Sequence, residues 1–522
     1  MRARGDVYSI AIVGGGQAAK AILMILAERA MGQGAARSPM RVAIFERGRE
    51  IGPGFAWSST QNLTEHVASQ PGAASRVQYG REQVRVVERL VTALIAVNVH
   101  VDLFSEVEIV DLQRSDGKWI LLAENSTWRA EAVVLATGHW RNTPPELAEV
   151  PHQYPWPATV LQETVVDLPP GADIAVLGSY HTAIDSALTI ALALGRFEEH
   201  SNHIRYVANR AFKTTLLSRT GRLPLVWPGV VPKFEPRYLR ETFAGKAAPG
   251  ECGTVRLEEL LCAVRRELSG GSGRNAVRAI SELTRLLDKL YLHDSFATLE
   301  RCLEPRKWTP RNLGRMAAMA TLLPLVSELF PHLDAGSYLQ FQRRYRTAFF
   351  NVAMPMPRIT AKRIRALMGA GVLAVEAIGR YSWRVVNGKP TLFRQTASSE
   401  SAGRSFDLLA NGLASCGAIA RHPGRLMRSL LAKGVIAPAS REYAAADWTP
   451  GRKRLLVAGV QIDHRSCEVM PAATAAGAAR SGCRLYAMGP NNEGLFLDAQ
   501  SIGQLARDAA RIVSHIETQR AG

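Results

Sequence analysis

Three small residues near the start of the chain follow an apolar run at a spacing suited to binding phosphate. The run at residues 10–13 ends at Gly14, and Gly16 and Ala19 complete the pattern G-x-G-x-x-A. Gly14 allows a tight turn, Gly16 lets the backbone approach a pyrophosphate, and Ala19 lets the following helix pack on the strand. Free N–H groups at the helix N-terminus favour negative charge. The predicted dinucleotide-binding residues of this turn are Gly14, Gly15, Gly16, Gln17, Ala18 and Ala19.

An acidic residue stands where such a turn needs a partner for ribose. The second apolar segment, residues 41–46, ends in Glu46, and Arg47 follows it. A carboxylate at the end of the second strand can accept hydrogen bonds from both ribose hydroxyls. The turn and Glu46 therefore predict a strand–turn–helix–strand unit that binds a dinucleotide.

A second glycine-rich loop after Glu46 makes the pattern more specific. The loop carries Gly52 and Gly54, followed by the aromatic residues Phe55 and Trp57. On these motifs the chain resembles the two-dinucleotide flavoproteins, in particular bacterial FAD/NAD(P)-binding proteins similar to flavin-containing monooxygenases and amino-acid N-hydroxylases. The resemblance implies that the first turn holds FAD, and that Gly54, Phe55 and Trp57 lie along the path to the flavin ring.

The resemblance also implies which residues stand beside the flavin ring. Relatives often carry Leu-Asn-Val at the place of residues 61–67, and His66 takes the position of the asparagine. The candidate catalytic residues are therefore Gln61, Asn62 and His66, as hydrogen-bond partners of the flavin N5 or of a flavin peroxide. Polar groups satisfied within their own loop are the alternative for the same three residues.

The strand–turn–helix pattern recurs at residues 174–185, which makes it an internal repeat. The resemblance assigns this copy to NAD(P), but Tyr180 replaces the middle glycine, where a side chain would crowd a pyrophosphate. Either the loop is displaced so that its polar residues contact phosphate, or the affinity for the cofactor is weak.

The second strand of this repeat favours NADPH over NADH. It ends in Ser218 and Arg219, at the position where an NAD-binding fold would carry an acid. A hydroxyl and a forked guanidinium can bind the 2′-phosphate of NADPH. The predicted NADPH-binding residues are Gly178, Ser179, His181, Thr182, Ser218 and Arg219.

Two further segments are expected to return to the FAD site. The apolar run 132–136 ends in Thr137 and Gly138, and the glycine permits close approach to the cofactor. In the resembling flavoproteins a C-terminal strand, a glycine and a helix close the site, which here implies Gly489, Asn492, Gly494 and Leu495. The Pro-rich segment 144–157, whose His152 and Trp156 half-match a monooxygenase fingerprint, is predicted to be a linker.

The predicted fold is α/β, with two Rossmann-like domains carrying the glycine turns, antiparallel β meanders and a helical insertion. Residues 1–160 form the first part of the FAD-binding domain, and 421–522 form its closing part. Residues 161–235 and 371–420 form the NAD(P)-binding domain. Helical spacing of apolar residues over 236–370 predicts an insertion that covers the active site.

Composition limits the classes of protein that remain. The 522 residues carry a net charge of +18, but the basic residues are dispersed, so no nucleic-acid partner is expected. Six cysteines without C-x-x-C spacing argue against disulfides, a redox dithiol or a zinc site, and no metal ligands are predicted. The absence of 18 uninterrupted apolar residues predicts no membrane span, and we expect a cytoplasmic protein.

The resemblance implies an FAD-dependent, NADPH-using monooxygenase whose partners are O2 and a small polar substrate such as an amino acid, an amine or a heterocycle. Oxygen transfer would proceed through a flavin C4a-hydroperoxide, for which the protein supplies positioning and exclusion of water. Two alternatives stay open. One is an FAD-dependent NAD(P)H oxidoreductase without oxygen insertion, and the other, indicated only by the net charge, is a flavoprotein that binds or modifies RNA.

Overall fold

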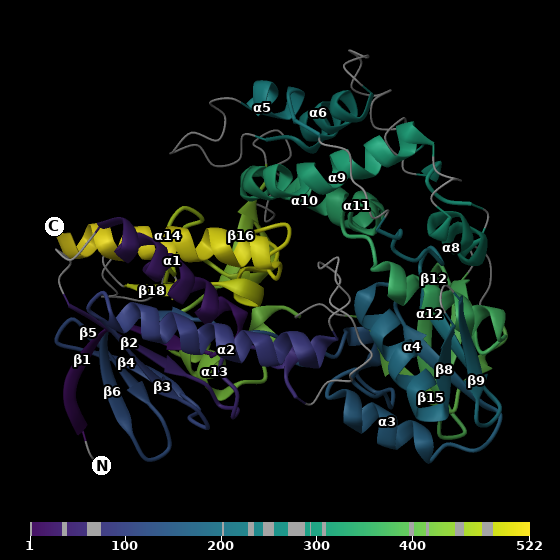
Figure 1. Cartoon of the computed structure of the whole chain (residues 1–522), viewed down its shortest axis with the longest axis horizontal. Coiled ribbons are helices and arrows are strands. Elements are labelled where there is room, and N and C mark those ends of the chain that lie inside the picture. The colour runs from purple at the N-terminus through teal and green to yellow at the C-terminus, as the bar shows by residue number, and fades with distance from the viewer. Residues whose placement is uncertain are drawn as a thin grey trace.

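Two α/β lobes and a block of helices that bridges them make up the molecule (Figure 1). The computed structural model describes the following residues: 3–33, 39–59, 75–200, 203–227, 234–243, 255–269, 285, 288–292, 294–304, 309–395, 401–413, 417–443, 454–471 and 484–521. Both termini of the described chain belong to the first lobe (Figure 1).

The first lobe is built on a seven-stranded sheet with the order β3-β2-β1-β6-β5-β4 and with β18 beside β6. Its strands are β1 (Ala3–Val13), β2 (Met40–Phe45), β3 (Val99–Phe104), β4 (Asp111–Ser115), β5 (Lys118–Leu122), β6 (Thr127–Leu135) and β18 (Leu485–Ala487). β1 pairs in parallel with β2 and with β6, so the strand ends at Val13, Phe45 and Leu135 meet at one edge. Ligands of parallel α/β sheets bind at this edge.

Helices cover both faces of this sheet. One face carries α1 (Gln17–Gln33), α2 (Arg76–Ile95) and α14 (Ile502–Ala521), as Figure 1 shows. The short helix α13 (Arg425–Ala432) packs against β4, where Ser429 and Lys433 bond the Asp111 carboxylate. The hairpin β16 (Pro438–Glu442) and β17 (Arg454–Val460) completes the lobe.

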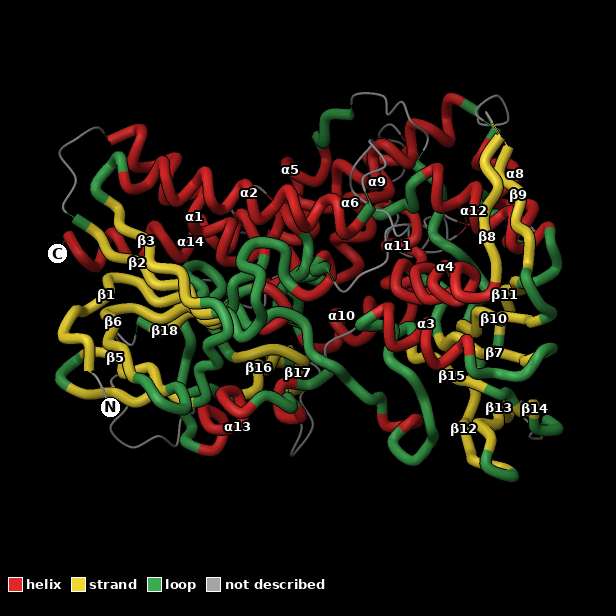
Figure 2. The backbone as a smooth tube through the Cα atoms, turned by 60° about the horizontal axis from the view of Figure 1, so that its bottom comes forward, coloured by secondary structure: helices red, strands yellow, loops and turns green. Residues whose placement is uncertain are grey.

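The second lobe repeats the plan with a smaller sheet in the order β11-β10-β7-β15, in which every pairing is parallel (Figure 2). Its strands are β7 (Ala172–Leu177), β10 (Phe212–Ser218), β11 (Leu373–Ala377) and β15 (Leu408–Asn411), with helices α3 (Ala158–Val166) and α4 (His181–Leu194). The order β10-β7-β15 corresponds to β2-β1-β6 of the first lobe. The prediction of an α/β fold with two Rossmann-like units is therefore confirmed.

Smaller strand pairs flank the second lobe. An antiparallel sheet is formed by β12 (Arg380–Val386), β13 (Lys389–Gln395) and β14 (Arg404–Ser405). A hairpin of β8 (Gly195–His200) and β9 (His203–Ala208) follows α4. In β9, Ile204 and Tyr206 alternate with polar residues and are buried, as in a half-buried strand.

The bridging block is helical throughout its described part. Its helices are α5 (Tyr238–Phe243), α6 (Leu257–Ser269), α8 (Ser295–Leu303), α9 (Pro310–Leu329), α10 (Ala335–Gln340), α11 (Arg346–Ala353) and α12 (Arg358–Gly369), with a π-helical turn over Phe341–Tyr345. One segment, Asn312–His332, is long and apolar enough to cross a membrane, although the uninterrupted-run criterion predicted none. Of an 18-residue apolar window in this segment, 56% is buried inside the molecule.

The two lobes are joined by chain crossings and by a buried ion pair. The two crossing segments, residues 138–157 and the described residues of 411–424, bond to each other, because Asn411 N–H donates to Gln153 O at 2.8 Å and the Asn411 side-chain amide donates to Asn142 O at 3.1 Å. The Arg76 guanidinium at the start of α2 pairs with the Asp185 carboxylate of α4. The apolar core of the second lobe is continuous with that of the helical block, while the first lobe has a core of its own.

Candidate functional site: a dinucleotide cavity

The first glycine turn is built for close contact between strand ends. Gly14 has a φ of +112° and donates its N–H to Phe45 O at 2.8 Å. A Cβ atom there would lie 2.1 Å from Ala136 O, so only glycine fits between β1 and β6. Gly16 packs on Gly54, since a Cβ on Gly16 would lie 3.2 Å from the Gly54 Cα. The two glycine loops predicted from the sequence therefore lie against each other.

The start of α1 offers donors and one unused acceptor to this space. The helix begins at Gln17, so the first N–H groups have no acceptor within the helix. The Gln17 amide donates to Gly52 O at 2.8 Å, but its Oε1 atom has no hydrogen-bond partner among the described residues. Because an amide oxygen only accepts, this atom can receive a hydrogen bond from a hydroxyl of a bound ligand, while the free N–H groups of the helix can donate to phosphate.

Glu46 is held rigidly in the place predicted for a ribose-binding acid. Its Oε2 atom accepts the Gly15 N–H and its Oε1 atom accepts the Gly48 N–H, both at 2.8 Å. These bonds use two of the four lone-pair positions of a carboxylate, and Glu46 lines the cavity. The carboxylate can therefore accept from a ribose diol without moving.

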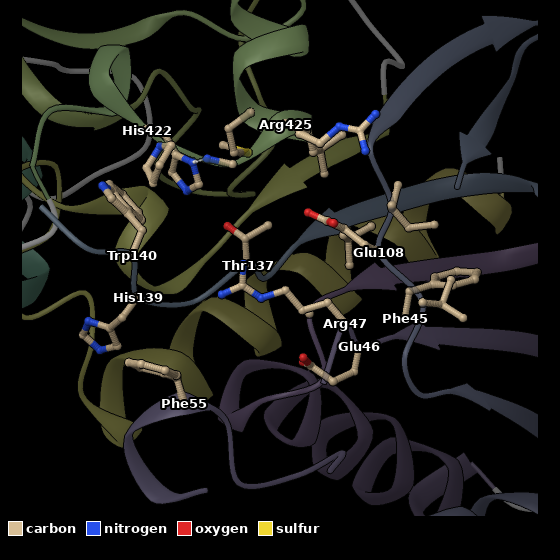
Figure 3. Close-up of a pocket in the computed structure, with 18 of the residues that line it drawn as sticks. Phe45, Glu46, Arg47, Phe55, Glu108, Thr137, His139, Trp140, His422 and Arg425 are labelled. Carbon is tan, nitrogen blue, oxygen red and sulfur yellow. Dashed lines mark hydrogen bonds between the residues drawn. The ribbon is translucent and has the colours of Figure 1, made fainter. Parts of the chain in front are cut away.

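Two adjoining cavities of about 560 and 400 Å³ run along the strand ends. Both are lined by Gly14, Glu46, Arg47, Phe55, Thr137 and His139. Figure 3 shows Glu46, Arg47 and Thr137 converging there, with Trp140 and His422 together on the opposite wall. Ligand pockets typically measure about 300–1,000 Å³, so the pair can hold an extended dinucleotide such as FAD.

Several residues that line the two cavities were not predicted from the sequence. The smaller cavity continues along residues 107–109 to Trp140 and His422, while the larger continues along residues 53–59 to Met488. Residues 107–109 follow the end of β3, so their place at the carboxyl edge of the sheet was a signal that could have found them. Trp140 and His422 come from the two crossing segments and meet only in the folded chain, with ring centroids 4.3 Å apart.

The histidines of the cavity wall are neutral at physiological pH. Burial first, and then the nearby Arg76 charge, lowers the pKa of His139 to about 4. Burial, followed by the Arg47 charge, lowers the pKa of His422 to about 4. The Nδ1 atom of His422 accepts the Gly424 N–H at 2.9 Å, so the neutral ring carries its proton on Nε2. The wall near both cavities is therefore strongly desolvated and adds no positive charge from histidine.

The predicted C-terminal closing residues lie mostly behind this wall. Asn492 is fully buried and donates to Ala487 O at 2.9 Å, and Leu495 is also buried. Gly489 and Gly494 have positive φ values of +68° and +84° and shape the chain there. The closing segment and α14 contact the larger cavity through Met488, Pro490, Gln500 and Leu505 instead.

The second glycine turn is covered by the protein itself. Gly178 keeps a φ of +114°, but the Ser179 hydroxyl donates to Arg222 O at 2.7 Å. The His181 ring bonds Met354 O through Nε2 at 3.0 Å, and Thr182 is buried. At the end of β10 the Ser218 hydroxyl accepts the Gly221 N–H at 3.1 Å, while Arg219 is exposed.

Most of the predicted FAD-binding residues line one cavity, whereas the predicted NADPH-binding residues line neither of the two cavities described above. Of the first group, Gly14, Gly16, Gln17, Ala18, Glu46, Arg47, Gly54, Phe55, Trp57, Thr137 and Gly138 line the larger cavity. Gly15 and Ala19 lie directly behind that lining. The candidate catalytic residues Gln61, Asn62 and His66 lie outside the described residues.

Comparison with known proteins agrees with the first site. Residues 11–74 and 65–140, in the N-terminal part of the chain, match the model of a FAD-NAD(P)-binding family. The match confirms the expectation of FAD and a nicotinamide dinucleotide as the cofactor class. The uncharacterized protein YdhS of Escherichia coli (strain K12) is 23% identical over 466 residues, which cover 76% of this chain and 82% of that protein.

Solved structures with similar architecture are distant. L-lysine 6-monooxygenase from Pseudomonas syringae is 11% identical, with a TM-score of 0.45 over 98% of this chain and 99% of that chain. Ornithine N-hydroxylase from Kutzneria sp. 744 is 13% identical, with a TM-score of 0.44 over 99% and 100% of the two chains. Thioredoxin reductase from T. acidophilum is 10% identical, with a TM-score of 0.43 over 99% of each chain.

Proposed function

We propose that the protein is an FAD-dependent monooxygenase that takes electrons from NADPH and hydroxylates a small polar substrate. The observation that carries the proposal is the pair of joined cavities along the carboxyl edge of the first sheet, with the glycine turn and the fixed Glu46 carboxylate in their wall. FAD, when bound, supplies electron transfer and the activation of oxygen.

The chain's own residues bind and shield. The first N–H groups of α1 hold phosphate, and Glu46 holds a ribose through lone pairs that two backbone N–H groups leave free. The aromatic rings of Phe55 and Trp156, 6.1 Å apart, close the wall near His139 and exclude water. Exclusion of water suits an oxidising intermediate, because it prevents wasteful hydrolysis and proton leakage.

Two features favour oxygen chemistry over disulfide reduction. No pair of the six cysteines has C-x-x-C spacing, so a flavin has no redox dithiol of that kind beside it in the sequence. His139, which lines both cavities, stays neutral at physiological pH because burial lowers its pKa to about 4, so it offers no imidazolium to act as a general acid. An NAD(P)H oxidoreductase without oxygen insertion is the alternative that the following experiment distinguishes.

Oxygen and NADPH consumption by the FAD-loaded chain test the proposal. The protein is supplied with a panel of amino acids, amines and heterocycles, and hydrogen peroxide is measured in parallel. We expect at least one compound to accelerate NADPH oxidation, with one O2 consumed per NADPH and little peroxide formed. Complete recovery of the oxygen as peroxide with every compound, or oxidation of NADPH that needs no oxygen, would overturn it. Glu46→Gln should weaken FAD binding and therefore lower the rate of NADPH oxidation. Glu106→Gln, which changes an exposed acid outside the cavities, is the matched control and should keep the wild-type rate.

A further inference from the structure

We infer that the turn between β7 and α4 is a docking site for the helical insertion, and that the chain does not hold the nicotinamide dinucleotide there. The inference goes beyond the proposed function, since it concerns where NADPH is bound and not whether it is oxidised. It follows from three sets of contacts that occupy the turn.

The residue at the second position of the turn fills the space that a phosphate needs. Tyr180 stands where Gly16 stands in the first lobe, and its ring contacts the His181 ring with centroids 4.5 Å apart. Its hydroxyl reaches Phe350 O of α11 at 3.4 Å. In the first lobe the corresponding position has no side chain, and among the described residues a Cβ on Gly16 would approach only the backbone of Gly54. The side chain of Tyr180 thus meets the insertion where a pyrophosphate would meet the backbone.

The loop after β10 folds over the same turn. Ser179 donates to Arg222 O at 2.7 Å, which places this loop across the turn. The Arg222 guanidinium pairs with Asp288 at 2.6 Å and lies over the Tyr291 ring, 4.7 Å from its centroid. The Ser295 hydroxyl donates to Gly221 O at 2.7 Å. The loop that would carry the adenosine of a dinucleotide is therefore tied down by the insertion.

The corner between α11 and α12 closes the remaining side. The His181 ring bonds Met354 O at 3.0 Å, and the neighbouring Met356 N–H donates to Leu225 O at 2.7 Å. Leu225 N–H in turn donates to Asn351 O at 2.9 Å. Apolar side chains from α4 and α11, among them Ile184 and Phe350, belong to one continuous buried core. The contact is part of the fold of the second lobe and not a loose surface contact.

Gly178, the glycine that this turn shares with the first one, is required by the packing of the strands. A Cβ on Gly178 would lie 3.1 Å from Gly412 O, at the end of β15, and its φ is +114°. Gly178 is thus needed for strand packing whether or not a dinucleotide is bound. On this inference NADPH does not bind at the turn, and Arg219 does not select its 2′-phosphate.

Titration of the FAD-loaded chain with 2′,5′-ADP and with ADP-ribose, followed by calorimetry, tests the inference. We expect no saturable binding of either probe at millimolar concentration. Binding of equal strength in wild type and in Arg219→Ala and His181→Asn also supports the inference, since the probe then binds elsewhere. Saturable binding of 2′,5′-ADP that Arg219→Ala weakens tenfold or more would overturn it. Arg205→Ala, an exposed arginine of β9, controls for loss of a positive charge.

A second variant tests whether the contacts of Ser179 and His181 alone keep a dinucleotide out of the turn. Tyr180→Gly restores the glycine pattern, but we still expect no binding, because Ser179 and His181 remain bonded to the chain. A tenfold or larger gain in affinity for ADP-ribose would contradict the inference. The titrations do not depend on turnover. If NADPH fails to reduce the bound FAD, the electron source in the proposed function is wrong, while the probes still report on the turn.

Discussion

Gly138 and Gly117 have the same left-handed backbone, with φ values of +70° and +73°, but only Gly138 lines the cofactor cavity. A Cβ atom at either position would meet no heavy atom within 4 Å. Substitution by alanine should therefore cost each variant a similar backbone strain of about 1–2 kcal/mol. We expect Gly138→Ala to weaken FAD binding at least tenfold, and Gly117→Ala to leave it unchanged.

Fluorescence titration of FAD into the two variants, with urea unfolding of each, makes the comparison. Equal loss of stability with a loss of affinity only in Gly138→Ala supports a cofactor in contact with the Gly138 backbone. Equal affinities would mean that the cofactor does not approach Gly138.

At the residue scale, the sequence predicted a binding residue best where neighbouring residues alone decide its role. The spacing of Gly14 and Gly16 and the acid at Glu46 follow from how one strand, one turn and one helix bind a dinucleotide. The second turn depends on more than its local pattern. Tyr180 indicated an altered site, but its cover comes from Met354 and Arg222, whose arrival no local pattern encodes.

At the scale of elements, one buried arginine joins the helical insertion to the segment that follows β18. The Arg441 side chain of β16 is buried and donates to the carbonyls of Phe330, Pro331, Leu333, Gly494 and Leu495. Arg441→Met would leave these acceptors without a charged donor, and each such bond contributes about 1.5–3 kcal/mol. We expect the variant to lose at least about 3 kcal/mol of unfolding free energy.

Arg454→Met provides the control, because Arg454 lies on the adjacent strand β17 and forms only an exposed ion pair with Glu442. Its expected cost is below about 1 kcal/mol. Urea unfolding measures both variants. Equal stability of the two would show that Arg441 does not join the insertion to the C-terminal segment.

The docking of the insertion on α4 should also depend on pH through His181. Burial lowers the pKa of His181 from 6.5 to about 4, and the bond to Met354 O opposes this lowering only in part. Between pH 6.5 and 4 the unfolded chain binds a proton at this position that the folded chain does not bind. Wild type should therefore lose stability as the pH falls through this window, and His181→Gln should lose less.

Melting temperatures at pH 7 and pH 5 test this difference. His203→Gln, which removes an exposed histidine of β9, should keep the wild-type dependence. A His181→Gln variant that loses as many degrees as wild type between the two pH values would contradict the assignment.

Elements were more predictable than their partners. The strand–turn–helix repeat and the strand that ends at Ser218 identified β7 and β10, because burial on a sheet leaves a pattern in each strand alone. Pairing and docking depend on surfaces far apart in the chain. The Trp140 and His422 wall and the Arg441 contacts are of this kind, so neither was predicted.

At the scale of the whole molecule, the ion pair between Arg76 and Asp185 connects the two lobes. Both side chains are nearly buried, with 11% and 7% of their surface exposed, and Arg76 also donates to Ala56 O at 3.2 Å. Removal of one partner from a buried pair leaves an uncompensated charge and costs about 3–5 kcal/mol. We expect this loss in Arg76→Met.

The double variant Arg76→Met/Asp185→Leu should recover most of the loss, since apolar replacement of both partners is often neutral. Urea unfolding of wild type, single and double variants measures the effect. A single variant as stable as wild type would show that the pair does not hold the lobes together.

For the whole molecule, we assign one flavin-binding site to the first lobe and none to the second. Equilibrium titration of the flavin-free chain with FAD, followed by flavin fluorescence, tests this most directly. We predict saturation at one FAD per chain. Glu46→Gln should weaken the affinity roughly tenfold or more, because it loses a charge-assisted hydrogen bond of about 1.5–3 kcal/mol. A chain that binds no FAD, or one that binds two, would contradict it.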